Sequence, residues 1–241
     1  GNAIIYGASG SGKTTFITTM VYSLISEHTP EEVVLYLLDF GSETLKVFKN
    51  LPHVGDVLLS DESDKIRSLF KMLSSEMNKR RKMFSDYGGD FNSYIRATRE
   101  PMAAIIVVIQ NYSAFYDTCE DEEESITVLT REGTKYGIYF VITASTTNAV
   151  RYRMLQNFKQ IVVLQLNDSS EYSGILGGTG GIYPSKYPGR GLIKKDAVYE
   201  FQTADITRNG DIREAIKPFC IEKSEDTDDM PYIFEPDLPN I

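Results

Sequence analysis

A glycine-rich stretch near the start of the chain constrains its fold more than any other feature. Residues 7–14 read Gly-Ala-Ser-Gly-Ser-Gly-Lys-Thr, between the apolar run 3–6 and a segment with helical periodicity. The spacing matches the GxxxxGK[ST] pattern, in which backbone N–H groups surround a phosphate, the lysine reaches the β- and γ-phosphates and the hydroxyl ligates Mg²⁺. The flanking strand and helix are the context that this pattern requires. The sequence therefore predicts a phosphate-binding loop for a nucleotide.

The pattern assigns a role to each residue of this loop. We expect one continuous segment to bind the cofactor ATP, and it consists of Gly7, Ala8, Ser9, Gly10, Ser11, Gly12, Lys13, Thr14 and Thr15. The hydroxyl of Thr14 is the expected ligand of Mg²⁺, the second predicted cofactor.

The composition limits the class of protein further. The chain has 241 residues, of which 41% are hydrophobic, and a formal net charge of −9. Its length suits one α/β domain with an appended segment. No apolar run approaches the roughly 20 residues of a membrane span. The acidic balance argues against a broad nucleic-acid-binding surface, because such surfaces need Lys and Arg. Because the first predicted strand begins almost at Gly1, we expect the chain to be a piece of a longer polypeptide.

Apolar runs of strand length alternate with helical patterns along most of the chain. We predict strands at 3–6, 33–38, 57–59, 104–109, 138–144 and 161–166, and helices at 13–27, 43–49, 60–84, around 126–130 and at 148–157. Such alternation is typical of a mostly parallel α/β sheet with helices on both faces. The most apolar run, 104–109, is expected in the interior of the sheet.

The composition of the sequence changes from residue 174 onward. Glycine and proline crowd the segment 174–191, and two short apolar runs follow at 192–193 and 199–201, which we interpret as antiparallel edge strands. Past residue 204 the chain becomes acidic and gains prolines. We therefore predict a domain at 1–204 and an acidic, Pro-containing linker or tail at 205–241, with one short helix at 212–219.

The strand that accompanies a phosphate loop usually ends in an aspartate that holds Mg²⁺, followed in motor ATPases by an acidic residue that orients the attacking water. Here the run 104–109 is followed by Gln110 and Asn111. An amide carries no charge for Mg²⁺ and cannot act as a base, and losing a positioned base costs about 10²–10⁴ in rate. We expect nucleotide binding to survive better than hydrolysis.

Other residues are candidates to compensate for the missing carboxylate. Asp39 ends the strand at 33–38 and Glu43 follows four residues later, although a turn residue at a strand end explains Asp39 equally well. Thr143 and Ser145 are candidate sensors of the γ-phosphate. An arginine from a neighbouring subunit is a further possibility, and the candidate donors are Arg80, Arg81, Arg131, Arg151 and Arg153. The basic run 79–82 is interpreted as a solvated helix end or a subunit contact.

Several segments together resemble a known family. In chain order they are GASGSGKTT, TPEEVVLYLLDF, LKVFKNLPHVGDVL, EMNKRRKMF, AAIIVVIQN, YGIYFVITAS and PGRGLI. They resemble the FtsK/SpoIIIE family of RecA-like motor ATPases. More narrowly, they look like one ATPase module of the membrane-anchored type VII secretion ATPases of the EssC or EccC type. The resemblance covers about residues 1–204. At Gln110 the chain departs from the family's aspartate, as the degenerate later modules of these secretion proteins do.

The resemblance implies properties that the residues alone do not. It implies a RecA-like P-loop NTPase fold and other ATPase modules in the same polypeptide, among which we take this chain as a middle module. It also implies assembly as a homo-oligomer, a hexamer, and small helical secreted substrates that dock on a module. The chain would be a cytoplasmic domain of a cell-membrane protein, associated with the membrane only through parts of the parent outside this sequence.

Three alternatives to a secretion motor module remain open. The first is a DNA translocase module of the same family, although the acidic charge disfavours nucleic acid as a partner. The second is a non-catalytic substrate-docking or assembly module, whose candidate surfaces are the loop 183–191 and the acidic tail. The third is a small-molecule kinase, for which no acceptor site is identifiable.

Overall fold

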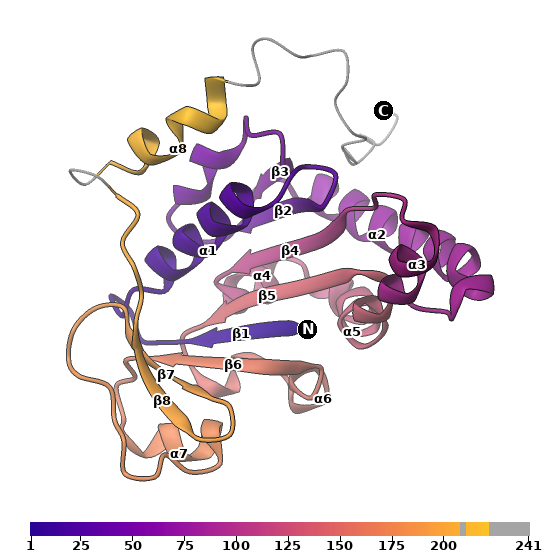
Figure 1. Ribbon diagram of the computed structural model, residues 1–241. Coiled ribbons are helices and arrows are strands. Elements are labelled where there is room, and N and C mark those ends of the chain that lie inside the picture. Colours follow the sequence, from indigo (N-terminus) through magenta and orange to yellow (C-terminus); the bar gives the residue numbers. More distant parts are fainter. Residues whose placement is uncertain (208–210, 222–241) are drawn as a thin grey trace.

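The computed structural model describes residues 1–207 and 211–221 (Figure 1). Its framework is an eight-stranded sheet with the order β3-β2-β4-β5-β1-β6-β7-β8. The strands are β1 (Asn2–Tyr6), β2 (Val33–Asp39), β3 (Val54–Leu59), β4 (Ala104–Gln110), β5 (Ile138–Ala144), β6 (Phe158–Leu164), β7 (Arg190–Lys194) and β8 (Val198–Gln202). The strands from β3 to β6 in this order run parallel, whereas β7 and β8 are antiparallel to their neighbours.

Helices and short 3₁₀ turns connect the strands. The helices are α1 (Lys13–Glu27), α2 (Ser63–Phe84), α3 (Phe91–Thr98), α4 (Tyr112–Thr118), α5 (Glu123–Glu132), α6 (Tyr152–Leu155), α7 (Ser170–Leu176) and α8 (Ile212–Ile221). The 3₁₀ turns are η1 (Thr44–Phe48), η2 (Ser85–Tyr87), η3 (Glu120–Glu122), η4 (Gly133–Tyr136) and η5 (Thr147–Ala149). Among the described residues, no helix is long and apolar enough to cross a membrane.

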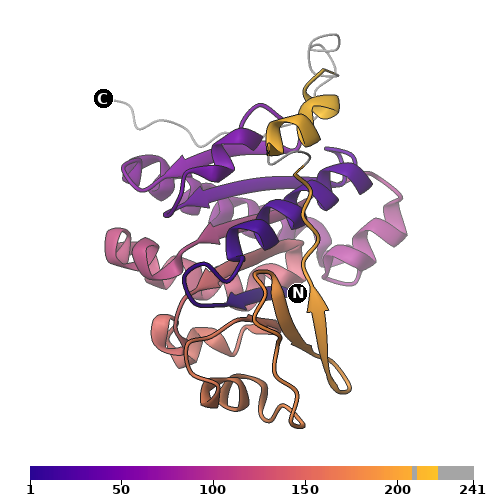
Figure 2. The same ribbon diagram turned by 90° about the vertical axis from the view of Figure 1, so that its left-hand side faces the viewer.

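Apolar side chains fill the space on both faces of the sheet. On one face α1, η1 and α8 pack through a cluster that includes Ile17, Val21, Phe48 and Ile216. On the other face α2, α4 and α5 contribute apolar residues such as Phe70 and Phe115 to a larger cluster. The turned view shows the sheet between these two helical layers (Figure 2). The predicted α/β class, with a mostly parallel sheet, helices on both faces and antiparallel edge strands, is therefore confirmed.

The strand that precedes the phosphate loop is an interior strand. β1 lies between β5 and β6, with Ile4 in register with Ile142 on one side and Ile161 on the other. The buried side chain of Asn2 fixes its start, because its Nδ2 donates to the Thr130 and Asn157 carbonyls at 2.7 and 3.1 Å. These contacts fasten the start of β1 to α5 and to the residue that precedes β6.

Most predicted strands and helices are present, but their bounds and number differ. The prediction of a helix over 148–157 is wrong, because this segment contains only η5 and the four-residue α6 before β6 begins at residue 158. The segment 43–49 forms the 3₁₀ turn η1. Three short helices, α3, α4 and α7, were not predicted, although Asp90 accepts the Ser93 N–H as an ordinary N-cap of α3.

The basic run 79–82 on α2 has two different environments. Arg80 is only 2% exposed, so its interpretation as part of a solvated helix end is wrong. Its Nε donates to Glu76 at 2.8 Å, and its two terminal nitrogens donate to the carbonyls of Tyr136 and Ala103 at 3.0 and 2.9 Å. Arg80 therefore fastens α2 to η4 and to the residue that precedes β4.

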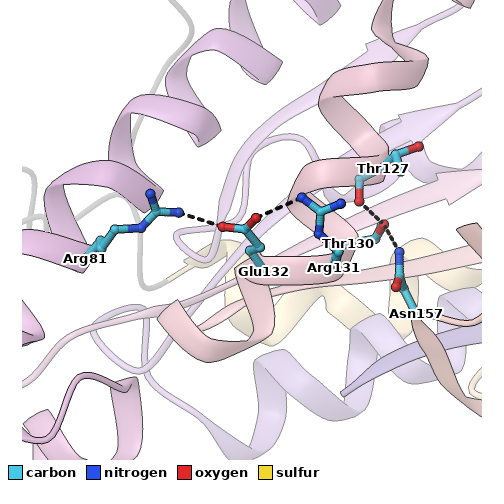
Figure 3. A network of polar contacts seen from close by, with 6 residues as sticks. All are labelled: Arg81, Thr127, Thr130, Arg131, Glu132 and Asn157. Atoms are coloured by element: carbon cyan, nitrogen blue, oxygen red, sulfur yellow. Dashed lines mark hydrogen bonds and ion pairs between the residues drawn. The ribbon is translucent and has the colours of Figure 1, made fainter.

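Its neighbour Arg81 belongs to a surface network instead. Arg81 contacts Glu132 of α5 at 2.6 Å, and Glu132 also pairs with Arg131 at 2.9 Å (Figure 3). The same view shows Thr130 between the Thr127 carbonyl and the Asn157 amide. Because these ion pairs are exposed, they contribute little to stability.

The chain after β8 returns to the face that carries α1. Helix α8, within the segment predicted as a linker or tail, buries Ile216 at 2% exposure. The ring of Phe219 packs edge-on against Tyr22 of α1, with 5.8 Å between ring centroids. The predicted helix at 212–219 is therefore present, and it is attached to the domain. The remainder of the predicted tail, 222–241, lies outside the described residues.

Candidate nucleotide-binding site

The loop Gly7–Thr14 begins where β1 ends and leads directly into α1. The Gly7 N–H donates to the Ala144 carbonyl at the end of β5, at 3.1 Å, and the Ala8 N–H donates to the Gln165 carbonyl just after β6, at 2.7 Å. The loop is therefore anchored to the strands on both sides of β1. This position, at the carboxyl edge of a parallel sheet, is where α/β proteins bind their ligands.

Two glycines give the loop its shape. Gly10 and Gly12 have φ angles of 74° and 100°, in the left-handed region that favours glycine. Gly12 precedes α1, which has neither a side-chain cap nor an acidic residue in its first turn. The first N–H groups and the positive end of the helix dipole thus remain available for an anion.

Lys13 is the first residue of α1 and folds back over the loop. Its Nζ donates to the carbonyl oxygens of Gly7 and Ala8 at 2.6 and 2.9 Å. These partners are neutral peptide groups, so they do not neutralise the ammonium charge. Partial burial lowers the pKa of Lys13, since desolvation disfavours the charged form. A phosphate group at the loop would provide the missing negative charge.

Thr14 faces an amide side chain at the end of β4. Gln110, at the end of β4, donates from Nε2 to Thr14 Oγ1 at 3.1 Å, and its Nε2 is 3.3 Å from Ser42 Oγ. The sequence therefore correctly indicated which strand end faces Thr14. The contribution of Ser42 was not predicted, because nothing in its local sequence distinguishes it from any other serine in a loop.

The two candidate compensating carboxylates have other partners. Asp39 is 2% exposed, and its two oxygens accept the N–H groups of Gly41 and Leu45, each at 3.0 Å. These contacts shape the turn after β2. Glu43 is exposed and pairs with Lys46 at 2.6 Å. Neither carboxylate forms a side-chain hydrogen bond or an ion pair with Thr14 or Gln110, and a catalytic role for either stays a prediction.

Asn111 supports the backbone at the end of β4. It has a φ of 65°, its Nδ2 donates to the Phe40 carbonyl at 3.1 Å, and its backbone N–H donates to Thr143 Oγ1 at 2.8 Å. The hydroxyl of Thr143, a candidate phosphate sensor, is fully buried by this arrangement. These two residues connect the ends of β2, β4 and β5 beside the loop.

The candidate arginines differ in how free they are to act on another subunit's nucleotide. Arg80 is excluded by its burial and its three protein partners. Arg151 is exposed but engaged, because it pairs with Glu123 at 2.7 Å and lies over the ring of Tyr116. Arg81 and Arg131 share Glu132. Arg153, on the short helix α6, is exposed.

The segment 185–189 also contacts the phosphate loop, which was not predicted from the sequence. The Gly189 N–H donates to the Ser11 carbonyl at 2.8 Å, and a side chain on Gly12 would come within 2.6 Å of the same nitrogen. Gln165 adds a further connection, since its Nε2 donates to the Ser185 carbonyl at 2.6 Å. The segment 185–189 therefore packs against the phosphate loop. The Pro-Gly-Arg-Gly sequence at 188–191, which overlaps the end of this segment, was the available signal.

The residues present fit a polyphosphate nucleotide. Glycines with positive φ, an uncapped helix N-terminus and a lysine without an anionic partner together form a phosphate cradle. The Thr14 hydroxyl is one suitable oxygen ligand for Mg²⁺, and the side chain beside it at the end of β4 is the neutral amide of Gln110. In the described part of the chain, no cluster of three or more His, Cys, Asp or Glu side chains could hold a metal ion.

A glycine loop with this lysine and threonine, joining the central strand of a parallel sheet to a helix, defines a P-loop NTPase. The profile of the FtsK/SpoIIIE family matches residues 1–177. The chain therefore belongs to the FtsK/SpoIIIE family.

Individual relatives are type VII secretion proteins. The ESX secretion system protein YukB of Bacillus subtilis is 34% identical over 200 residues, which is 83% of this chain and 13% of YukB. The structure of EssC (ATPases 2 and 3) from Geobacillus thermodenitrificans superposes with a TM-score of 0.83 at 29% identity, over 93% of this chain and 43% of that one. The structure of Thermomonospora curvata EccC (ATPases 2 and 3) with a signal sequence peptide gives a TM-score of 0.79 at 30% identity, over 91% of this chain and 41% of that one.

Proposed function

We propose that this chain is an ATP-binding module of a type VII protein secretion ATPase, and that it hydrolyses ATP slowly or not at all. The observation that carries the proposal is that the strand end beside the phosphate cradle presents the neutral amide of Gln110 to Thr14. The relatives support the secretion context. The chain corresponds to only 13% of the length of YukB, so the activity of a complete protein is inferred from the relatives.

Binding in this proposal uses the residues of the loop. The N–H groups at the start of α1 and the ammonium of Lys13 hold the phosphates, while Thr14 offers one oxygen on the metal side. Lys13 exchanges its carbonyl partners for phosphate oxygens, which are charged and therefore stronger acceptors. Hydrolysis lacks a base, because Gln110 and Asn111 are amides and Asp39 is occupied with backbone N–H groups.

The larger assembly is part of the same proposal. The module acts beside other ATPase modules of one polypeptide. It lies on the cytoplasmic side of a membrane, in which other parts of the protein are anchored. The complete protein works as a homo-oligomer, a hexamer in the family's manner, on small helical export substrates. Arg153 is the arginine best suited to reach a neighbour, because it is exposed and the hydrogen bonds and ion pairs given above engage the other candidates instead.

The binding half is tested by titrating ATP into the purified chain and into Lys13→Ala. Loss of one charged hydrogen-bond partner is worth about 1.5–3 kcal/mol, so the variant is expected to bind about 10- to 100-fold more weakly. Lys46→Ala, which removes an exposed lysine on η1, serves as the matched control and is expected to bind normally. Failure of the unmodified chain to bind ATP at millimolar concentration would refute the proposal.

A docking module is the second candidate function. The observation that favours it is an exposed set of apolar side chains near the edge hairpin, which consists of Ile182, Tyr183, Tyr187 and Tyr199. Measuring substrate export by the complete protein distinguishes the two functions. If Lys13→Ala stops export while a partner still binds, the nucleotide is required and a purely passive docking role is refuted.

A DNA translocase is the third candidate, and the net charge of −9 disfavours it. Tight duplex binding that weakens steeply with salt would support it.

A further inference from the structure

The surroundings of Thr14 carry an inference that rests on the proposed ATP binding and goes beyond it. In a metal-dependent site, a carboxylate beside this hydroxyl favours a divalent cation through its negative charge. Here Gln110 presents Nε2, the donor end of its amide, at 3.1 Å from Thr14 Oγ1 and 3.3 Å from Ser42 Oγ. The donor end carries partial positive charge, which disfavours a cation and favours an anion nearby.

The charge at this position does not depend on which end of the amide faces Thr14. Gln110 is 6% exposed, and its Oε1 is buried without a hydrogen-bond partner. Rotating the amide by 180° would exchange the two ends, but the group would remain neutral in either orientation. The position next to Thr14 therefore lacks charge for any arrangement of this side chain.

Neighbouring carboxylates do not replace the missing charge. Asp39, in register with Gln110 on the adjacent strand, uses both oxygens for the Gly41 and Leu45 N–H groups. Glu43 forms an exposed ion pair with Lys46 of η1. A carboxylate already held by backbone donors has less capacity to attract a cation, and rotating Asp39 away would break the turn after β2.

We propose that Gln110 makes this a site for nucleoside triphosphate whose affinity does not depend on a divalent cation. The charge of the phosphates is balanced by Lys13, by the N-terminus of α1 and by the donor end of the Gln110 amide. Gln110 is thus a specificity-determining residue, and a carboxylate at its position would convert the site to one that requires Mg²⁺.

The test compares ATP affinity with excess Mg²⁺ and with excess EDTA, measured by calorimetric titration of the purified chain. For the unmodified chain we expect the two dissociation constants to agree within about threefold, which is well under the 1.4 kcal/mol of a tenfold change. For Gln110→Asp we expect EDTA to weaken binding by more than about tenfold, because the unpaired carboxylate repels metal-free phosphates. Gln160→Asp adds the same charge at an exposed position of β6 and is expected to behave like the unmodified chain.

Each outcome supports or overturns the inference. If EDTA weakens binding to the unmodified chain by tenfold or more, the inference is wrong while ATP binding itself stands. If the unmodified chain binds ATP under neither condition, the proposed function fails and this inference fails with it. Circular dichroism verifies that Gln110→Asp is folded; if it is not, Gln110→Glu takes its place, and the comparison on the unmodified chain decides in either case.

Discussion

The backbone N–H of Gly189 lies 2.8 Å from the carbonyl oxygen of Ser11 and joins the edge hairpin to the phosphate loop. The carbonyl of Gly189 in turn accepts the Thr203 N–H at 2.8 Å, just after β8. Gly12 packs against this connection so closely that a side chain would meet the Gly189 backbone. The phosphate loop thus has supports on two sides, the strands β5 and β6 and the segment 185–189.

Gly12→Ala is expected to destabilise the protein more than Gly178→Ala. Both glycines have similar φ angles, 100° and 112°, so both substitutions incur the left-handed penalty of about 1–2 kcal/mol. Only Gly12 adds a steric conflict, since its Cβ would lie 2.6 Å from Gly189 N, whereas Gly178 has open space around it. Urea unfolding of the two variants measures the difference. Equal losses of unfolding free energy would contradict the close packing.

Asp39→Ala tests whether this carboxylate shapes the turn after β2. The Asp39 carboxylate accepts two backbone N–H groups, and a hydrogen bond to a charged group contributes about 1.5–3 kcal/mol. Because water replaces part of the loss, we expect the substitution to lower the free energy of unfolding by about 2–4 kcal/mol. Asp61→Ala, at an exposed position, is the control. Unchanged stability together with a loss of Mg²⁺-dependent ATP binding would instead assign Asp39 to the metal.

Arg80 and Arg81 are adjacent residues with different expected effects. Arg80→Ala leaves two carbonyls without their donor and leaves the buried Glu76 with Lys79, 3.6 Å away, as its partner, which costs about 3–5 kcal/mol of unfolding free energy. Arg81→Ala breaks an exposed ion pair with Glu132 and is expected to cost at most about 1 kcal/mol. Denaturant unfolding measures both changes. If Arg80→Ala were as mild as Arg81→Ala, the anchoring role of Arg80 would be disproved.

His53 is expected to make stability depend on pH in the mildly acidic range. Burial lowers the pKa of His53 below its ordinary 6.5, so the folded state binds fewer protons than the unfolded state. The contribution of His53 to the free energy of unfolding is complete above pH 6.5. It is lost as the pH falls from 6.5 towards the lowered pKa of the folded state.

Thermal unfolding across about pH 5–8 tests this for His53→Gln. The stability difference between the unmodified chain and this variant should shrink as the pH falls. A difference that is constant with pH would argue against a lowered pKa.

The sequence predicted the central part of the fold because that part obeys local rules. Apolar runs such as 104–109 need cover on both faces, and the glycine loop requires a strand before it and a helix after it. Helices α4 and α7 were missed because each is a short helix of seven residues, in segments with mixed composition. Helix α8 was predicted, but its attachment through Ile216 depends on tertiary contacts that periodicity does not contain.

The candidate site was predictable where one motif carries it. Residues 7–14 and the strand-end position of Gln110 followed from spacing and strand order. The packing of Gly189 on Ser11 and the burial of Arg80 were not predictable, because each depends on residues far apart in the sequence. A basic run appears uniform in the sequence, and only the packing of α2 separates Arg80 from its neighbours.

The central claim is that this site holds ATP without hydrolysing it effectively, and a single-turnover measurement tests it most directly. Radiolabelled ATP is bound to an excess of the purified chain with Mg²⁺, and the fractions of bound nucleotide and released phosphate are followed in the same sample. We predict that ATP is bound and remains intact over many minutes, since the amides of Gln110 and Asn111 cannot act as a base. Rapid release of phosphate, abolished by Lys13→Ala, would contradict the account.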